Sequence, residues 1–178
     1  MKRSALGIAL LVSAALPSIA LGQSCNAGGA PANCNVPGSV SITTGRVVRL
    51  LMSNGSTALA APTTADFDAG FNSTTGPSLT ISANAPWTLY IRANSALWTA
   101  TTTSPGAPAR SNKPAGDLKW STTANGSFAA LTTSDASLVG GTATASAATT
   151  LYFQTLYDWT VDTPGNYSLT VVLTLTAP

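Results

Sequence analysis

The side chains that most often carry out acid–base and nucleophilic catalysis are nearly absent from this sequence. It contains no histidine and no glutamate, and its acidic residues are six aspartates. General bases and zinc ligands come mainly from histidine, cysteine and the carboxylates. Paired aspartates can hydrolyse glycosides or peptides, but no Asp-Thr-Gly type signature is present. We therefore expect a protein that is not an enzyme and has no cofactor.

One short segment, residues 66–72, carries carboxylates at a spacing that occurs in calcium loops. Asp66 and Asp68 are separated by one residue. Calcium loops need several further oxygen ligands, and an EF-hand loop ends in a glutamate, which this chain lacks. We favour the alternative, in which the carboxylates cap backbone N–H groups while Phe67 and Phe71 anchor a loop to the core.

Four tryptophans offer aromatic faces on which a sugar ring can stack. Trp87, Trp120 and Trp159 each fall on a predicted strand, so we expect them in the core. Trp98 lies near the segment 101–114, which concentrates Pro, Gly, Ser and Asn and predicts a long surface loop. Trp98 is therefore the candidate contact for a ligand or carbohydrate.

Residues 1–22 have the organisation of a secretory signal peptide. Two basic residues precede an apolar stretch, and the small-x-small sequence at 20–22 provides a cleavage site. No later stretch is long and apolar enough to cross a bilayer. The sequence predicts an exported protein, extracellular, at the cell surface or in the periplasm, without a transmembrane segment.

Cys25 and Cys34 are the only two cysteines, and export takes them into an oxidising compartment where neighbouring thiols pair. We predict a disulfide that staples an N-terminal segment, residues 23–36, ahead of one folded domain, residues 37–178. A redox pair is the alternative, but it would favour CxxC spacing.

The chain that remains after residue 22 is formally neutral. Six arginines and lysines stand against six aspartates once Lys2 and Arg3 are removed. Without a basic cluster the chain has nothing to neutralise phosphates or an anionic bilayer. Nucleic acid is therefore not an expected partner.

Apolar residues recur with a period of two in short blocks separated by turn-forming residues. The clearest block, 167–176, predicts a half-buried strand, and the turn residues at 164–166 predict a hairpin with 148–161. The other predicted strands are 40–44, 46–52, 78–83, 87–93, 117–122 and 128–132. About seven to nine such strands predict an all-β fold, an antiparallel immunoglobulin-like β-sandwich.

Two further expectations follow from this pattern. One core between the sheets should contain Trp87, Leu89, Ile91, Trp120, Phe153, Tyr167, Leu169, Val171 and Leu173. The uncharged arm 35–44 has Val40 and Ile42 alternating with Ser and Thr. Such an arm can close its own sandwich or add to the edge of a neighbour, and its few apolar residues favour self-closure.

Two segments resemble the bacterial WxL-type surface domains. Trp87-Thr88-Leu89 is similar to the first motif of that family, and Tyr167-Ser168-Leu169-Thr170 opens a terminal segment similar to the second, with Leu173 where the family has its distal Trp. The terminal strand also resembles those of fimbrial and spore-coat sandwich proteins. Both resemblances imply a non-catalytic component of the cell surface or matrix, and the WxL resemblance implies attachment to the cell wall.

Low charge, abundant threonine and the lack of catalytic side chains favour a structural surface protein. Such a protein would be a subunit of a filament, coat or adhesive layer, with copies of itself or other surface proteins as partners. The alternative is a module that binds a cell wall or extracellular polysaccharide. A free strand edge or an accepting groove would favour the first function, and an exposed aromatic row near Asn and Asp would favour the second.

Overall fold

Antiparallel strands make up most of the regular structure in the computed structural model, which describes Gly28 and residues 39–178. The strands in this part of the chain are β1 Val48–Met52, β2 Phe71–Ala83, β3 Trp87–Ala93, β4 Thr99–Thr102, β5 Leu118–Ser121, β6 Ala129–Ala130, β7 Ala136–Gly141, β8 Thr144–Leu156, β9 Gly165–Ser168 and β10 Val171–Thr176. The helical elements are α1 Thr64–Ala69 and the 3-10 turn η1 Ala115–Asp117.

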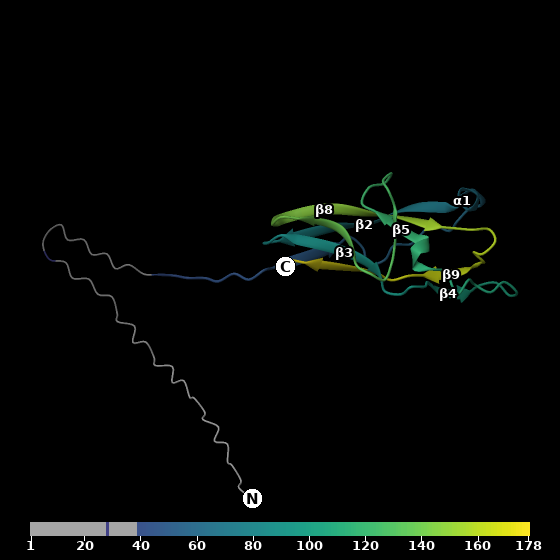
Figure 1. Cartoon of the computed structure of the whole chain (residues 1–178), viewed down its shortest axis with the longest axis horizontal. Coiled ribbons are helices and arrows are strands. Elements are labelled where there is room, and N and C mark those ends of the chain that lie inside the picture. Colours follow the sequence, from purple (N-terminus) through teal and green to yellow (C-terminus); the bar gives the residue numbers. More distant parts are fainter. Residues whose placement is uncertain (1–27, 29–38) are drawn as a thin grey trace, which may run out of the picture. The chain divides into compact units, whose positions relative to one another are not determined.

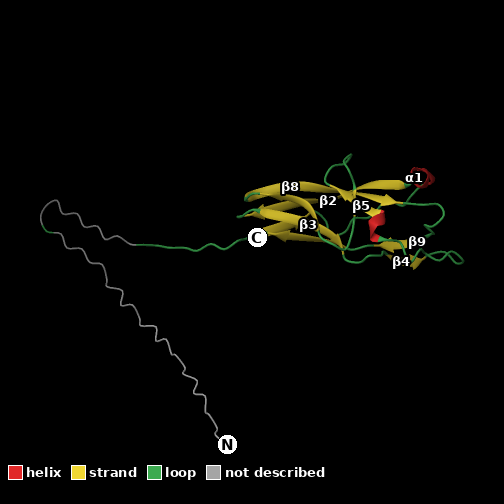
Figure 2. Ribbon diagram, in the orientation of Figure 1, coloured by secondary structure: helices red, strands yellow, loops and turns green. Residues whose placement is uncertain are grey.

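The strands of the unit Thr44–Pro178 form two sheets and a small ribbon. One sheet has the order β1-β2-β8-β5-β6, the other has the order β10-β3-β7, and β4 pairs with β9. Figure 1 shows β2 and β8 in one layer and β3 in the other, and Figure 2 shows how little helix accompanies them. The predicted antiparallel β-sandwich is confirmed.

Alternating residues of the central strands fill the space between the sheets. Leu79 and Ile81 of β2 and Leu89 and Ile91 of β3 are fully buried, as the period of two requires. The other buried apolar residues are Ala83, Trp87, Ala93, Trp98, Ala115, Leu118, Trp120, Leu131, Leu151 and Phe153. Five of the nine predicted core residues are therefore buried, and the four from the terminal segment are only partly buried against them.

The predicted turn at 75–77 lies inside β2. This strand runs for 13 residues and pairs with β8 through a register shift between Thr75 and Ser78. The irregularity accommodates Pro77, which has no N–H to donate. A Cβ at Gly76 would stand 2.6 Å from the Phe153 ring, so only glycine allows this close approach. Turn-forming residues here mark a bulge and not a chain reversal.

The predicted hairpin between 148–161 and 167–176 is wrong. β8 pairs with β2 and β5, whereas β9 pairs with β4 and β10 pairs with β3. The connection after β8 therefore crosses from one sheet to the other. Alternation fixes which residues face inward, but it carries no information on which strand lies alongside.

The N-terminal part of the chain also differs from the prediction. Residues 39–47 form no strand, and the first strand is β1. Val40 and Ile42 are exposed. The predicted strand at 40–44 is therefore not formed.

Candidate functional site: an open groove beside β10

The last strand, β10, is the edge of its sheet. It pairs with β3 along Val171–Thr176, and no strand of the described chain pairs with its other side. The row that faces the core, Leu169, Val171, Leu173 and Leu175, is only half-buried. An apolar row on a free edge is an unusual arrangement, because natural sheets tend to protect such edges with charge, bulges or covering segments.

A groove of about 800 Å³ follows Leu169, Val171 and Leu173 of this row and continues along Tyr167 and Ser168 of β9. Its opposite wall is formed by Leu50 and Met52 of β1, the outer strand of the other sheet, and by the irregular segment 54–59. Its inner lining includes Leu151 and Phe153 of the core. The groove therefore opens between the edge strands of the two sheets and reaches the apolar interior.

No side chain in the lining of this groove carries a charge. The polar groups of the lining are hydroxyls and one amide, from Asn54, Ser56, Thr57, Tyr167, Ser168 and Thr170, together with the Trp98 indole. Burying an isolated charge against such a surface would be costly. The groove suits an uncharged segment with alternating apolar side chains, and it offers no paired groups for acid–base chemistry.

Trp98 lies in the wall of the groove and not on an exposed platform. It is 6% exposed, and its Nε1 donates to the carbonyl oxygen of Pro114 at 3.0 Å. The prediction for Trp159 is wrong in the opposite sense, because this residue lies beyond the end of β8 and is 57% exposed. A Trp in an irregular segment is buried here by a long-range contact that has no local sequence signal.

The two candidate calcium ligands make other contacts. Asp66 and Thr63 form a capping box at the start of α1, with the Asp66 carboxylate accepting from Thr63 N at 2.7 Å. This bond and the one from the Thr63 hydroxyl lower the pKa of Asp66. Asp68 accepts from Trp159 Nε1 at 3.1 Å. In the described residues no three acidic, Cys or His side chains gather as a metal site would require.

The remaining site predictions fall outside the described residues. Cys25, Cys34 and the signal segment 1–22 all belong to this part of the chain. The disulfide and the export signal stay predictions.

A cluster of four charged side chains lies beside β9 and has no counterpart in the predictions. Lys113 Nζ lies 2.8 Å from Asp162 Oδ1 and 3.3 Å from Asp117 Oδ2, and it also donates to the carbonyl oxygen of Leu156 at 2.9 Å. Arg110 Nη1 bridges the same two carboxylates at 3.0 and 3.2 Å. All three Lys113 donors are satisfied, so this cluster fixes the segment 110–117 against the end of β8 and has a structural role.

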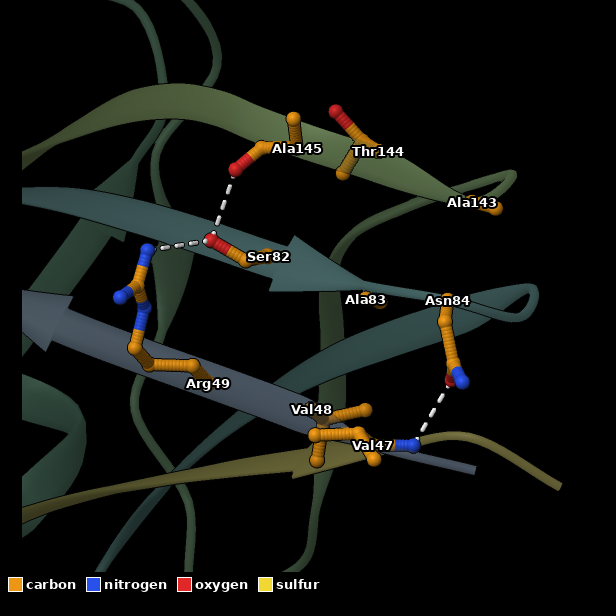
Figure 3. A pocket seen from close by; sticks show the side chains of 9 residues that line it. All are labelled: Val47, Val48, Arg49, Ser82, Ala83, Asn84, Ala143, Thr144 and Ala145. Carbon is orange, nitrogen blue, oxygen red and sulfur yellow. Dashed lines mark hydrogen bonds between the residues drawn. The ribbon is translucent and has the colours of Figure 1, made fainter. Parts of the chain in front are cut away.

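Figure 3 shows a second hollow, of about 610 Å³, where β1 begins and β2 ends. Its polar groups bond to one another: Arg49 donates to Ser82 Oγ at 3.0 Å, and Ser82 Oγ donates to the carbonyl oxygen of Ala145 at 2.8 Å. Asn84 accepts from Val47 N at 2.7 Å and donates to the carbonyl oxygen of Gly45 at 2.8 Å. These bonds fix the point at which the chain enters β1.

Neither the protein-family models nor the curated proteins contain a match to this chain. In the described part of the chain, no helix has the length and apolar character that a membrane crossing needs. The function therefore has to be argued from the groove and from the surface of the molecule.

Proposed function

We propose that this protein is a non-catalytic structural subunit that is exported and assembles with copies of itself. One observation carries the proposal: the free edge of β10 runs beside an uncharged groove that opens onto the core. A strand added there would pair with unused backbone groups and insert alternate side chains into the groove. The lack of histidine and glutamate supports the non-catalytic part, and the predicted signal peptide supports export.

The proposed occupant is the segment 39–44 of a second copy. Its sequence, Ser-Val-Ser-Ile-Thr-Thr, carries no charge and places Val40 and Ile42 on one face of an extended strand. These two apolar side chains are 100% and 88% exposed. Six extended residues span about 20 Å, which matches the six residues of β10.

Exposure of these side chains is costly in water, and each would gain about 1.5–3 kcal/mol if it became fully buried. The half-buried row of β10 would gain in addition from the same contact. Assembly would therefore bury two apolar surfaces at once, that of the arm and that of β10, and it would add main-chain hydrogen bonds. Assembly also needs no charged group, which agrees with the formal neutrality of residues 23–178.

The test is the concentration dependence of the sedimentation of the exported protein. We expect oligomers that grow with concentration, and electron microscopy should show chains or layers. Val40→Ser combined with Ile42→Ser should give folded monomers, because it removes the apolar side chains of the occupant and leaves the groove intact. Leu51→Ser is the matched control, because Leu51 is a 50% exposed residue of β1 that does not line the groove.

An armless protein separates this assembly from other kinds of association. A variant that lacks residues 23–44 should stay monomeric alone, and it should shorten the oligomers of intact protein because it accepts an arm and donates none. A native protein that stays monomeric at high concentration, or an armless one that still polymerises, would overturn the proposal.

A further inference from the structure

Three aromatic side chains form a cluster at the α1 end of the molecule, which we call the tip cluster: Phe67, Tyr157 and Trp159. The ring centroid of Phe67 lies 4.6 Å from that of Trp159 and 5.3 Å from that of Tyr157. Trp159 is 57% exposed, whereas the other three tryptophans are 9% exposed or less. One face of a large apolar ring is thus supported by protein while the residue remains open to solvent.

The exposed indole is held in place by contacts on both sides. Its Nε1 donates to Asp68 Oδ1 of α1 at 3.1 Å. The turn that carries it is fixed by Asp158, whose Oδ1 accepts from Thr160 N at 2.7 Å and from Thr160 Oγ1 at 2.6 Å. Asp158 N donates in turn to Asp162 of the buried charged cluster at 2.9 Å. An exposed aromatic ring that is already ordered loses little conformational entropy when it binds a ligand.

We infer that the tip cluster is a binding site for a neutral saccharide, with a sugar ring stacked on the exposed face of Trp159. The C–H face of a pyranose is apolar and flat enough to cover an indole, and the ring edge carries hydroxyl groups. The exposed side chains of Asp68, Asp158 and Thr160 offer acceptors and a hydroxyl beside the indole for those groups. This inference does not depend on the proposed assembly.

The charge around the tip selects among saccharides. Hydrogen bonds from Thr160 lower the pKa of Asp158, and those from Thr63 lower the pKa of Asp66. Both carboxylates therefore stay ionised at neutral pH, and burial raises the pKa of the Tyr157 hydroxyl, which stays neutral. Lys113 Nζ lies 5.4 Å from the centre of the Tyr157 ring, but it is buried and paired with Asp162 and Asp117, so exposed carboxylates set the charge of this surface. Such a surface repels uronates and sulfated glycans, and a neutral glycan is the expected ligand.

The tip cluster lies at the end of the sandwich opposite the start of β1, which is where the arm joins the domain. β2 begins at Phe71, directly after α1, and ends at Ala83, which pairs with Val48 at the start of β1. Figure 1 shows α1 at one end of the body and the C-terminus at the other. A strand of this length spans roughly 40 Å. A subunit held by its arm would therefore present the tip cluster away from the junction.

Acrylamide quenching of tryptophan fluorescence tests the inference, because Trp159 alone among the four is exposed. Linear hexaoses of glucose, xylose and N-acetylglucosamine are the probes, with oligogalacturonate and choline chloride as charged comparisons. At least one neutral hexaose should protect the quenchable tryptophan. Trp159→Ala should weaken binding about tenfold or more, measured by calorimetry, whereas Trp159→Tyr should retain part of it. Leu51→Ala, an exposed apolar change in β1, should leave binding unchanged.

Each of the following results would contradict the proposed saccharide site. Protection by choline alone would indicate a cation bound over the indole, and protection by oligogalacturonate alone would contradict the charge argument. Binding that survives in a folded Trp159→Ala variant would locate the saccharide elsewhere, and no protection by any hexaose would leave the cluster without this function. Val40→Ser combined with Ile42→Ser should bind the same hexaose as the native chain, which separates this result from a failure of assembly.

Discussion

The two halves of the C-terminal segment 165–176, β9 and β10, come from one alternating stretch of sequence and have different surroundings. In the β9 half, the Tyr167 hydroxyl accepts from Arg110 N at 2.9 Å and donates to the carbonyl oxygen of Thr163 at 2.6 Å. In the β10 half, Leu173 lies opposite Ile91 of β3, yet Ile91 is fully buried and Leu173 is not. Tyr167 and Leu173 are both only partly buried, so the two strands differ in what holds them: β9 is fixed by hydrogen bonds, and β10 presents an apolar row.

The difference lies in what covers each half. The segment 110–117, held by the buried charges of Lys113 and Asp162, closes the β9 end. In the β10 half, Val171 and Leu173 line the groove, which has no charged side chain and continues along Tyr167 and Ser168 of β9. Polar contacts with a fixed geometry hold the β9 half within the chain, whereas the β10 half presents an apolar surface, at which we propose that another chain binds.

The largest effect should come from the charges that hold the β9 half. Lys113→Met should lower the free energy of unfolding by about 3–5 kcal/mol, because it leaves two carboxylates to share Arg110 in a buried setting. Urea unfolding measures the change. Arg92→Met is the control, since the side chains of Arg92 and Asp135 are 36% and 51% exposed. That exposed pair should contribute less than about 1 kcal/mol, and equal losses would show that the buried cluster has no special role.

Truncation of paired residues tests the β10 half directly. Ile91→Ala should cost about 2–5 kcal/mol as a buried large-to-small change. Leu173→Ala should cost about 1–2 kcal/mol in the monomer, because a half-buried leucine has less to lose. The difference between the two losses of stability should be smaller in assembled protein, where the proposed arm would cover Leu173. Losses that are equal in the monomer would mean that β10 is already covered.

The inward-facing residues of the central strands could be predicted from sequence, because apolar and polar residues alternate along these strands with a period of two. β3 occupies the predicted residues 87–93, and Leu89 and Ile91 are buried as expected. The expected capping role of Asp66 is also confirmed, but the loop it was assigned to is the helix α1. The local sequence signals for that helix were Thr63 and Asp66 at capping-box spacing and a glycine at position 70. In the structure Gly70 ends the helix with a positive φ of 79°.

The groove and the tip cluster could not be predicted, because both depend on contacts between distant residues. No local feature shows that β10 pairs with β3 alone or that Trp98 reaches the carbonyl of Pro114. The four members of the charged cluster are spread over residues 110–162, and single charges at such spacings look like solvated surface. Strand pairing, which local alternation does not encode, decides which apolar rows stay open.

An effect smaller than that of Lys113→Met or Ile91→Ala should come from the hydroxyl that fixes β9. Tyr167→Phe removes one acceptor and one donor and leaves Arg110 N and the carbonyl of Thr163 without this partner, so we expect a loss of about 1–2 kcal/mol in urea unfolding. Tyr90→Phe, a change at a half-buried tyrosine of β3, is the control, and the loss should be below about 0.5 kcal/mol. Tyr167 also lines the groove, but Phe keeps its ring and removes only the hydroxyl, so Tyr167→Phe should leave the sedimentation of assembled protein unaltered. A Tyr167→Phe variant that lost its oligomers would show that the hydrogen bonds of β9 are needed for assembly at β10. It would contradict the separation of β9, held by polar contacts, from β10, the proposed acceptor.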